Sequence, residues 1–133
     1  MRTTRQNPET VAPPIGSYSH AVCIETEGAV WIHVSGQIAN DPDGRLVAPG
    51  DLPAQTERVF ENLRLILEAN GAGFADVVKL QTFVTTFEGF AESREIRARY
   101  LPEEPPASTA VRVVGLVVPD AVIEVDLVAV VPA

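Results

Sequence analysis

Hydrophobic residues recur with a helical period in the middle of the chain. They fall on one side of a helix, while most of the charged residues between them lie elsewhere on it. The apolar positions are Val59, Leu63, Ile66 and Leu67. Asp51 is suited to cap the start of this helix, Pro53 fits its first turn, and Asn70-Gly71 is suited to end it. The pattern therefore predicts a helix between Asp51 and Asn70 that packs by one side.

Five other segments are rich in β-branched and aromatic residues or alternate between apolar and polar ones, as strands do. They are Tyr18–Thr26, Ala29–Ser35, Val77–Val84, Ser108–Val114 and Val122–Val131. Glu27-Gly28 between the first two is typical of a hairpin turn. A second helix is expected over Glu88–Leu101, where Pro102 ends it.

The resulting order of elements, ββαβαββ, predicts an α+β fold in which both helices cover one face of a single mixed sheet. No interdomain linker or internal repeat divides the chain, so residues 1–133 are expected to form one domain. No segment approaches the roughly 20 apolar residues that a membrane span requires, because Pro119-Asp120 interrupts the longest candidate.

The charge balance argues against a nucleic-acid partner. The chain has 10 Lys and Arg against 18 Asp and Glu, a net charge of −8. Nucleic-acid affinity depends on clustered cations that neutralise phosphates, and no basic tract is present. The partner expected is therefore a small-molecule substrate or ligand.

The single cysteine, Cys23, excludes an intrachain disulfide and is compatible with a reducing cytoplasm, where we expect the protein. Strand alternation places His20 on the opposite face from Cys23, so a buried structural thiol is expected. His20 and His33 have no metal-type partners in the sequence, and we expect no metal site. The N-terminal arginines precede no apolar run, so no signal peptide is expected.

The last two expected strands carry unusual polar residues. Ser108, Ala110 and Arg112 share one face of the first, and Glu124 and Asp126 share one face of the second. If the two strands pair antiparallel, Arg112 lies close to Glu124 and Ala110 close to Asp126. The residues then form either an ion pair on a solvated sheet face or part of a polar cleft.

Five blocks of sequence extend this picture over nearly the whole chain. They are Ile15–Val22, Val34–Ile38, Gln55-Thr56 with Asn62-Leu63, Asp76–Lys79, and Pro106–Val111 with Ile123–Val125. Each block alone is weak, but in this order they resemble the RidA/YjgF family. The resemblance implies a chorismate-mutase-like fold and a homotrimer with clefts between neighbouring subunits. It also implies hydrolysis of reactive enamines and imines of 2-oxo acids to the ketone and ammonia, without metal or organic cofactor.

The resemblance also assigns roles to residues of the cleft. Tyr18 lines it, Ser35 and Gly36 offer backbone hydrogen bonds, and Glu124, the expected catalytic residue, positions a water. Arg94 occupies a further cleft position on the second helix, where an asparagine is frequent. Together with Ser108, Ala110 and Arg112, these residues make up the expected substrate-binding site.

Ser108 departs from the family pattern, because it occupies the position of an arginine that binds the substrate carboxylate. Losing such a charge-assisted hydrogen bond costs about 1.5–3 kcal/mol of binding. Either Arg94 or Arg112 supplies the cation, or the substrate has no carboxylate there, or the reaction has been lost. Arg94 also shares its helix with other charged residues, which favours a solvated charged face over a ligand contact; they are Glu92, Glu95, Arg97 and Arg99.

Three functions remain in competition. The leading one is hydrolytic deamination of a small imine or enamine, with an altered substrate. The second is a trimeric protein that binds a metabolite, or acts as a regulator, without catalysis. The third is an endoribonuclease or translation inhibitor, an activity reported for some family members, against which the acidic composition counts.

Overall fold

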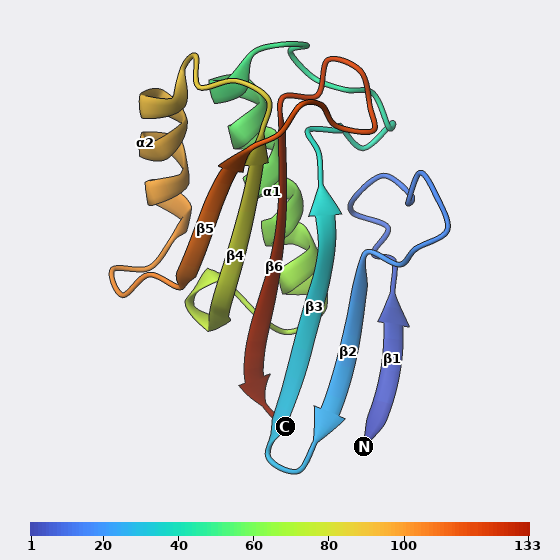
Figure 1. Cartoon of the computed structure of the whole chain (residues 1–133). Coiled ribbons are helices and arrows are strands. Elements are labelled where there is room, and N and C mark those ends of the chain that lie inside the picture. The colour runs from blue at the N-terminus through green and yellow to red at the C-terminus, as the bar shows by residue number, and fades with distance from the viewer.

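A mixed sheet of six strands forms the centre of the protein, seen in a computed structural model that describes residues 1–133 (Figure 1). The strands are β1 (Arg2–Gln6), β2 (Ala21–Thr26), β3 (Ala29–Gln37), β4 (Val77–Val84), β5 (Ala107–Arg112) and β6 (Ile123–Pro132). They are arranged in the order β1-β2-β3-β6-β4-β5, and only β4 and β5 run parallel. The α+β class and the single mixed sheet are therefore confirmed.

Two α-helices lie on one face of this sheet, as expected. They are α1 (Leu52–Ala69) and α2 (Phe90–Tyr100), and a short 3₁₀ helix, η1 (Phe74–Asp76), precedes β4. The carboxylate of Asp51 accepts a hydrogen bond from the backbone N–H of Ala54 at 3.0 Å, so the predicted N-cap is confirmed. Gly71, just after α1, has a φ of 73°, a value that favours glycine and ends the helix.

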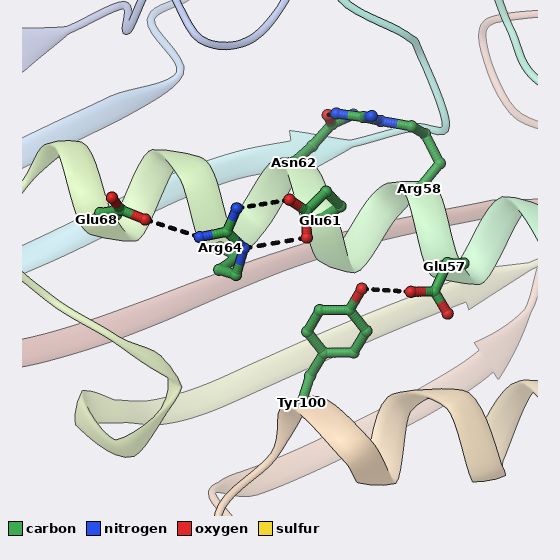
Figure 2. Close-up of polar contacts among 7 residues, drawn as sticks. All are labelled: Glu57, Arg58, Glu61, Asn62, Arg64, Glu68 and Tyr100. Atoms are coloured by element: carbon green, nitrogen blue, oxygen red, sulfur yellow. Dashed lines mark hydrogen bonds and ion pairs between the residues drawn. The ribbon is translucent and has the colours of Figure 1, made fainter.

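The inner side of α1 belongs to the core, and its outer side is charged (Figure 2). Arg64 on the outer side pairs with Glu61 at 2.6 Å and with Glu68 at 2.7 Å. Tyr100 at the end of α2 donates its hydroxyl proton to Glu57 of α1 at 2.6 Å (Figure 2). The two helices thus form one layer that covers the buried side of β3, β6 and β4.

The expected pairing of the last two strands is wrong. β4 lies between them, parallel to β5 and antiparallel to β6. Arg112 of β5 pairs in register with Val84 of β4, and Val84 pairs on its other side with Ile123 of β6. Glu124, the next residue of β6, lies opposite Phe83 of β4. Arg112 therefore points to the helix side of the sheet and Glu124 to the open side, so no ion pair joins them. The cause is the connection through α2, which makes β5 a parallel neighbour of β4 and leaves β6 to enter on the other side.

The strand β1 was not anticipated from the sequence. All five of its residues are polar and four are exposed, so no apolar alternation marks it. It forms an edge of the sheet only because its backbone pairs with β2, from Arg2 opposite Glu25 to Gln6 opposite Ala21.

The core between the helices and the sheet contains the residues that the hydrophobic pattern had selected. Val59, Leu63, Ile66 and Leu67 are fully buried. Cys23 is also buried, as expected, and burial raises the pKa of its thiol, which makes it a poor nucleophile. No helix combines the length and the hydrophobicity that a membrane crossing needs.

Candidate active site

A pocket of about 310 Å³ lies where the loop before β2, the end of β3 and the segment that leads into β6 meet. Ile15, Gly16 and Tyr18 reach it from the loop before β2, and Val117 reaches it from the loop before β6. The remaining lining residues are Ser35 and Gly36 on β3 and Glu124 at the start of β6. In Figure 1 these segments gather at the upper end of the sheet. We call this cavity the Glu124 pocket.

An irregularity in β3 shapes the floor of this pocket. Val34 pairs with Leu127 and Gln37 with Val125, so Ser35 and Gly36 together lie opposite the single residue Asp126. This is the arrangement of a β-bulge, which re-aims backbone groups and is common beside active sites. A β carbon on Gly36 would stand only 2.8 Å from the carboxylate of Glu124, so the glycine is required for the close approach of that side chain.

Glu124 is half-buried in the pocket. Burial and, secondarily, the neighbouring charge of Asp126 raise the pKa of Glu124 above its ordinary value. Asp126 lies two residues along β6 on the same face, and burial raises its pKa too, although Lys79 opposes the shift. A raised pKa makes a carboxylate a better proton acceptor than an ordinary glutamate, which suits a general base.

Two buried polar residues hold the wall of the pocket in place. His20 donates from Nε2 to the carbonyl of Ala12 at 2.7 Å, and its Nδ1 accepts from the amide of Gln37 at 3.1 Å. The same amide donates to the carbonyl of Ser35 at 3.1 Å. His20 is thus structural, as expected, and these bonds tie the loop before β2 to the bulge. The role of Gln37 was missed, because its partners are distant in sequence.

The tyrosine and the serine of the expected site face the same pocket. Tyr18 is 42% exposed, so it is free to contact a ligand, and its ring meets that of His20 edge to face at 6.2 Å. The hydroxyl of Ser35 donates to the carbonyl of Ser19 at 2.6 Å, which fixes the loop against β3. Four expected residues, Tyr18, Ser35, Gly36 and Glu124, are therefore brought together.

The other expected residues do not reach the Glu124 pocket within one chain. Ser108 and Ala110 lie on the helix side of β5, beneath α2. Arg94 and Ala110 line a second cavity, of about 370 Å³, between α2 and β5, and Arg97 of α2 lines it as well. Arg112 lines neither cavity and lies beside Thr85 at the end of the sheet. Arg97, which the sequence reasoning had treated only as surface charge, donates from Nη2 to the hydroxyl of Ser108 at 3.0 Å.

No group of three or more His, Cys, Asp or Glu side chains is arranged to hold a metal ion. The Glu124 pocket offers a carboxylate, side-chain hydroxyls and backbone groups to a ligand.

Comparison with known proteins places this geometry in a family. The sequence model of the family described as endoribonuclease L-PSP matches residues 9–131. The chain belongs to this family, also called RidA/YjgF. A RutC family protein of Pyrococcus abyssi is 38% identical over 121 residues, which cover 91% of this chain and 91% of that protein. The 3-aminoacrylate deaminase RutC of Acinetobacter baylyi is 36% identical over 122 residues, covering 92% of this chain and 93% of that enzyme.

Solved structures of the RidA/YjgF family share the fold of this chain. A crystal structure of a protein from Thermotoga maritima superposes with a TM-score of 0.88 at 36% identity, with 100% of both chains covered. The resemblance drawn from the five sequence blocks is thereby confirmed. The family includes a deaminase of an enamine, since 3-aminoacrylate is one.

Proposed function

We propose that this protein hydrolyses a small reactive imine or enamine, without a metal or organic cofactor, at a cleft between the subunits of a homotrimer. The observation that carries the proposal is the half-buried carboxylate of Glu124, held against Gly36 in a pocket that Tyr18 and Ser35 also line. Membership of a family that includes a 3-aminoacrylate deaminase supports the same reaction class.

Glu124 serves as the proton shuttle in this reaction. The carboxylate accepts a proton from a water molecule whose oxygen forms a bond to the imine carbon. The C=N electron pair moves to nitrogen, which takes up a proton from solvent. In the resulting carbinolamine, Glu124 returns its proton to nitrogen as the C–N bond breaks. The hydroxyl proton passes to solvent, and the products are a ketone and ammonia. An enamine first takes up a proton at carbon, which converts it to the imine. General acid–base catalysis of this kind contributes about 10²–10⁴-fold.

The open face of the sheet supports the proposed trimer. Trp31 on β3 is 42% exposed and Val111 on β5 is 41% exposed, although each belongs to a strand, and no helix covers them. The face is mixed in polarity, because Lys79 and Asp126 lie among these residues. Such a mixed face is suited to burial against copies of the same chain. We also propose that the protein acts in the cytoplasm and has no nucleic-acid partner; the single buried thiol and the acidic composition support this.

Replacement of Glu124 tests the proposal. Imines are generated in the assay by an amino-acid oxidase, from alanine and from 2-aminobutanoate, and their disappearance is followed. Glu124→Gln keeps the size of the side chain and one acceptor, so the oligomer should persist while turnover falls by about 10²-fold or more. Glu68→Gln, on the outer side of α1 and 70% exposed, is the matched control and should retain turnover.

Two results would count against catalysis. Equal turnover by Glu124→Gln and the wild type would remove Glu124 as the proton shuttle. A wild type that accelerates no imine, yet binds the corresponding 2-oxo acid, would favour the non-catalytic binding protein, for which the replacement of the family arginine by Ser108 is the motivating observation.

A further inference from the structure

The cavity between α2 and β5 is built differently from the Glu124 pocket. Its volume is about 370 Å³, and it is lined partly by apolar groups, among them Phe90, Leu101 and Ala110. Two guanidinium side chains, Arg94 and Arg97, line it from α2. We call it the arginine cavity.

The charged residues of α2 lie on two different sides of the helix, and only Arg94 and Arg97 face the arginine cavity. Glu92, Glu95 and Arg99 lie together on the side away from the cavity, and Arg99 pairs with Glu57 of α1 at 3.2 Å. Arg94 and Arg97 have no carboxylate within 4.0 Å. The arginine cavity therefore contains two cations and no internal counter-ion, in a protein whose net charge is −8.

Arg97 is the more buried of the two cations. Burial and the nearby charge of Arg94 lower its pKa, so the folded protein makes the charged form of Arg97 less favourable than it is in water. Its one side-chain hydrogen bond is donated to the neutral hydroxyl of Ser108. A half-buried guanidinium that has no anionic partner retains N–H groups without acceptors. The planar arrangement of these N–H groups matches the two oxygens of a carboxylate.

We propose that Arg94 and Arg97 bind the carboxylate of a small organic acid in the arginine cavity, with Ser108 orienting the Arg97 guanidinium. The apolar part of the lining then receives a short aliphatic chain. That this acid is the imine substrate rests on the proposed function; the anion site itself does not.

A guanidinium supplied by α2 accounts for the serine on β5. An arginine at position 108 would project from the helix side of β5 into the space that the Arg97 guanidinium occupies, since Ser108 already lies 3.0 Å from it. Like charges at that distance repel, so an arginine at position 108 and the guanidinium of Arg97 would disfavour each other. The cation of this chain is therefore carried by the helix instead of the strand.

The position of the arginine cavity has a consequence for the complete site. Glu124 points to the open side of the sheet, whereas Ser108 and Ala110 point to the helix side, with β4 between their strands. One small substrate contacts both Glu124 and Arg97 only if two copies of the chain supply them, as in the trimer proposed above.

Ligand binding tests the anion site without any catalytic step. The probes are 2-oxobutanoate and 2-butanone, which share a ketone but differ in the carboxylate, and binding to the full-length oligomer is measured by titration calorimetry. The wild type should bind 2-oxobutanoate saturably and 2-butanone at least about ten-fold more weakly. Arg97→Gln should raise the Kd for 2-oxobutanoate at least about ten-fold, and Arg97→Lys, which keeps the charge but not the fork, should give an intermediate value.

Arg99→Gln is the matched control, because it removes the same charge from the same helix on the side away from the cavity, and its Kd should equal that of the wild type. An unchanged Kd in Arg97→Gln would overturn the proposal, and so would equal binding of the two probes or the absence of saturable binding. Tighter binding of inorganic phosphate than of 2-oxobutanoate would also overturn it.

Mixed oligomers test whether Glu124 and Arg97 act on one substrate. Glu124→Gln and Arg97→Gln chains are co-expressed with different tags, and the mixed species are purified. In a trimer that contains both kinds of chain, one of the three clefts combines an intact Glu124 with an intact Arg97, so turnover of the purified mixed species should return to about one third of the wild-type value. No recovery would overturn the shared site. Loss of turnover in Glu124→Gln with unchanged binding and turnover in Arg97→Gln would leave the proposed function standing and remove only the inference about Arg97.

Discussion

The carboxylate of Glu124 lies so close to the backbone of Gly36 that it leaves no room for a side chain at position 36. A β carbon on Gly36 would stand 2.8 Å from the carboxylate carbon and 2.8 Å from one of its oxygens. The β-bulge at Ser35-Gly36 and the start of β6 are thus fitted to each other. The position of the acid depends on the absence of a side chain on the neighbouring strand.

Gly36→Ala should displace the Glu124 carboxylate with little effect on folding. The clashing atoms are the far end of a flexible side chain, so that side chain moves and the backbone stays in place. We expect the free energy of unfolding to change by less than about 1 kcal/mol and turnover to fall about 10–10²-fold, because the proton shuttle is misplaced. Gly115→Ala, at a glycine with open space around it, is the control and should leave both quantities unchanged. Wild-type turnover in Gly36→Ala would contradict the prediction.

The acid side of the pH profile should report the raised pKa of Glu124. The shuttle needs the ionised carboxylate, and burial together with the charge of Asp126 disfavours that form. Turnover should therefore fall, as the pH is lowered, at a higher pH than an ordinary glutamate would cause. Asp126→Asn removes the repelling charge, which lowers the pKa of Glu124, so this limb should move to lower pH. An identical limb in Asp126→Asn would show that Asp126 does not influence the titrating group, and an upward-shifted limb would contradict the predicted sign of its effect.

Gln55 should be a major determinant of stability. It is fully buried on α1, and its amide nitrogen donates to three carbonyls while its oxygen accepts from one backbone N–H. The partners are Val47, Ala48, Asp120 and Val122. Gln55→Met keeps the volume but leaves these groups without partners, so the free energy of unfolding in urea should fall by about 2–5 kcal/mol.

A solvent-side change on the same helix serves as the comparison for Gln55. Glu68→Gln removes only an exposed ion pair with Arg64 and should cost less than about 1 kcal/mol. Equal unfolding curves for the two variants would mean that the Gln55 bonds contribute nothing net.

The oligomer should have a mass of three times 14.3 kDa in light scattering at micromolar concentration. Val128→Lys places a cation on the open face of β6, opposite Lys79 of β4 and His33 of β3. Because this residue does not face the helices, the chain should still fold, but charge repulsion and desolvation should shift the mass toward that of one chain. Glu27→Lys, in the exposed hairpin turn, should leave the trimer intact. A wild type of monomer mass would remove the trimer and the intersubunit cleft.

Interactions between neighbours in the chain were enough to predict several elements of this protein. The helix α1 was predictable because its period, its cap at Asp51 and its stop at Gly71 involve only neighbours in the chain. The turn at Gly28 was predictable for the same reason, and Gly28 has the positive φ of 83° that such a turn favours. The family resemblance assigned Glu124 and Gly36 to the cleft, and the alternation along the last strand placed Glu124 on one face.

The partners of the strands were decided only by the tertiary structure. A strand's alternation states which side chains share a face, but not which strand lies beside it. The sequence therefore did not reveal that β6 enters between β3 and β4, and so it did not separate Arg112 from Glu124. The polar strand β1 exists only through its pairing with β2. The contact of Arg97 with Ser108 likewise depends on how α2 packs over β5, a non-local arrangement that no spacing along the chain encodes.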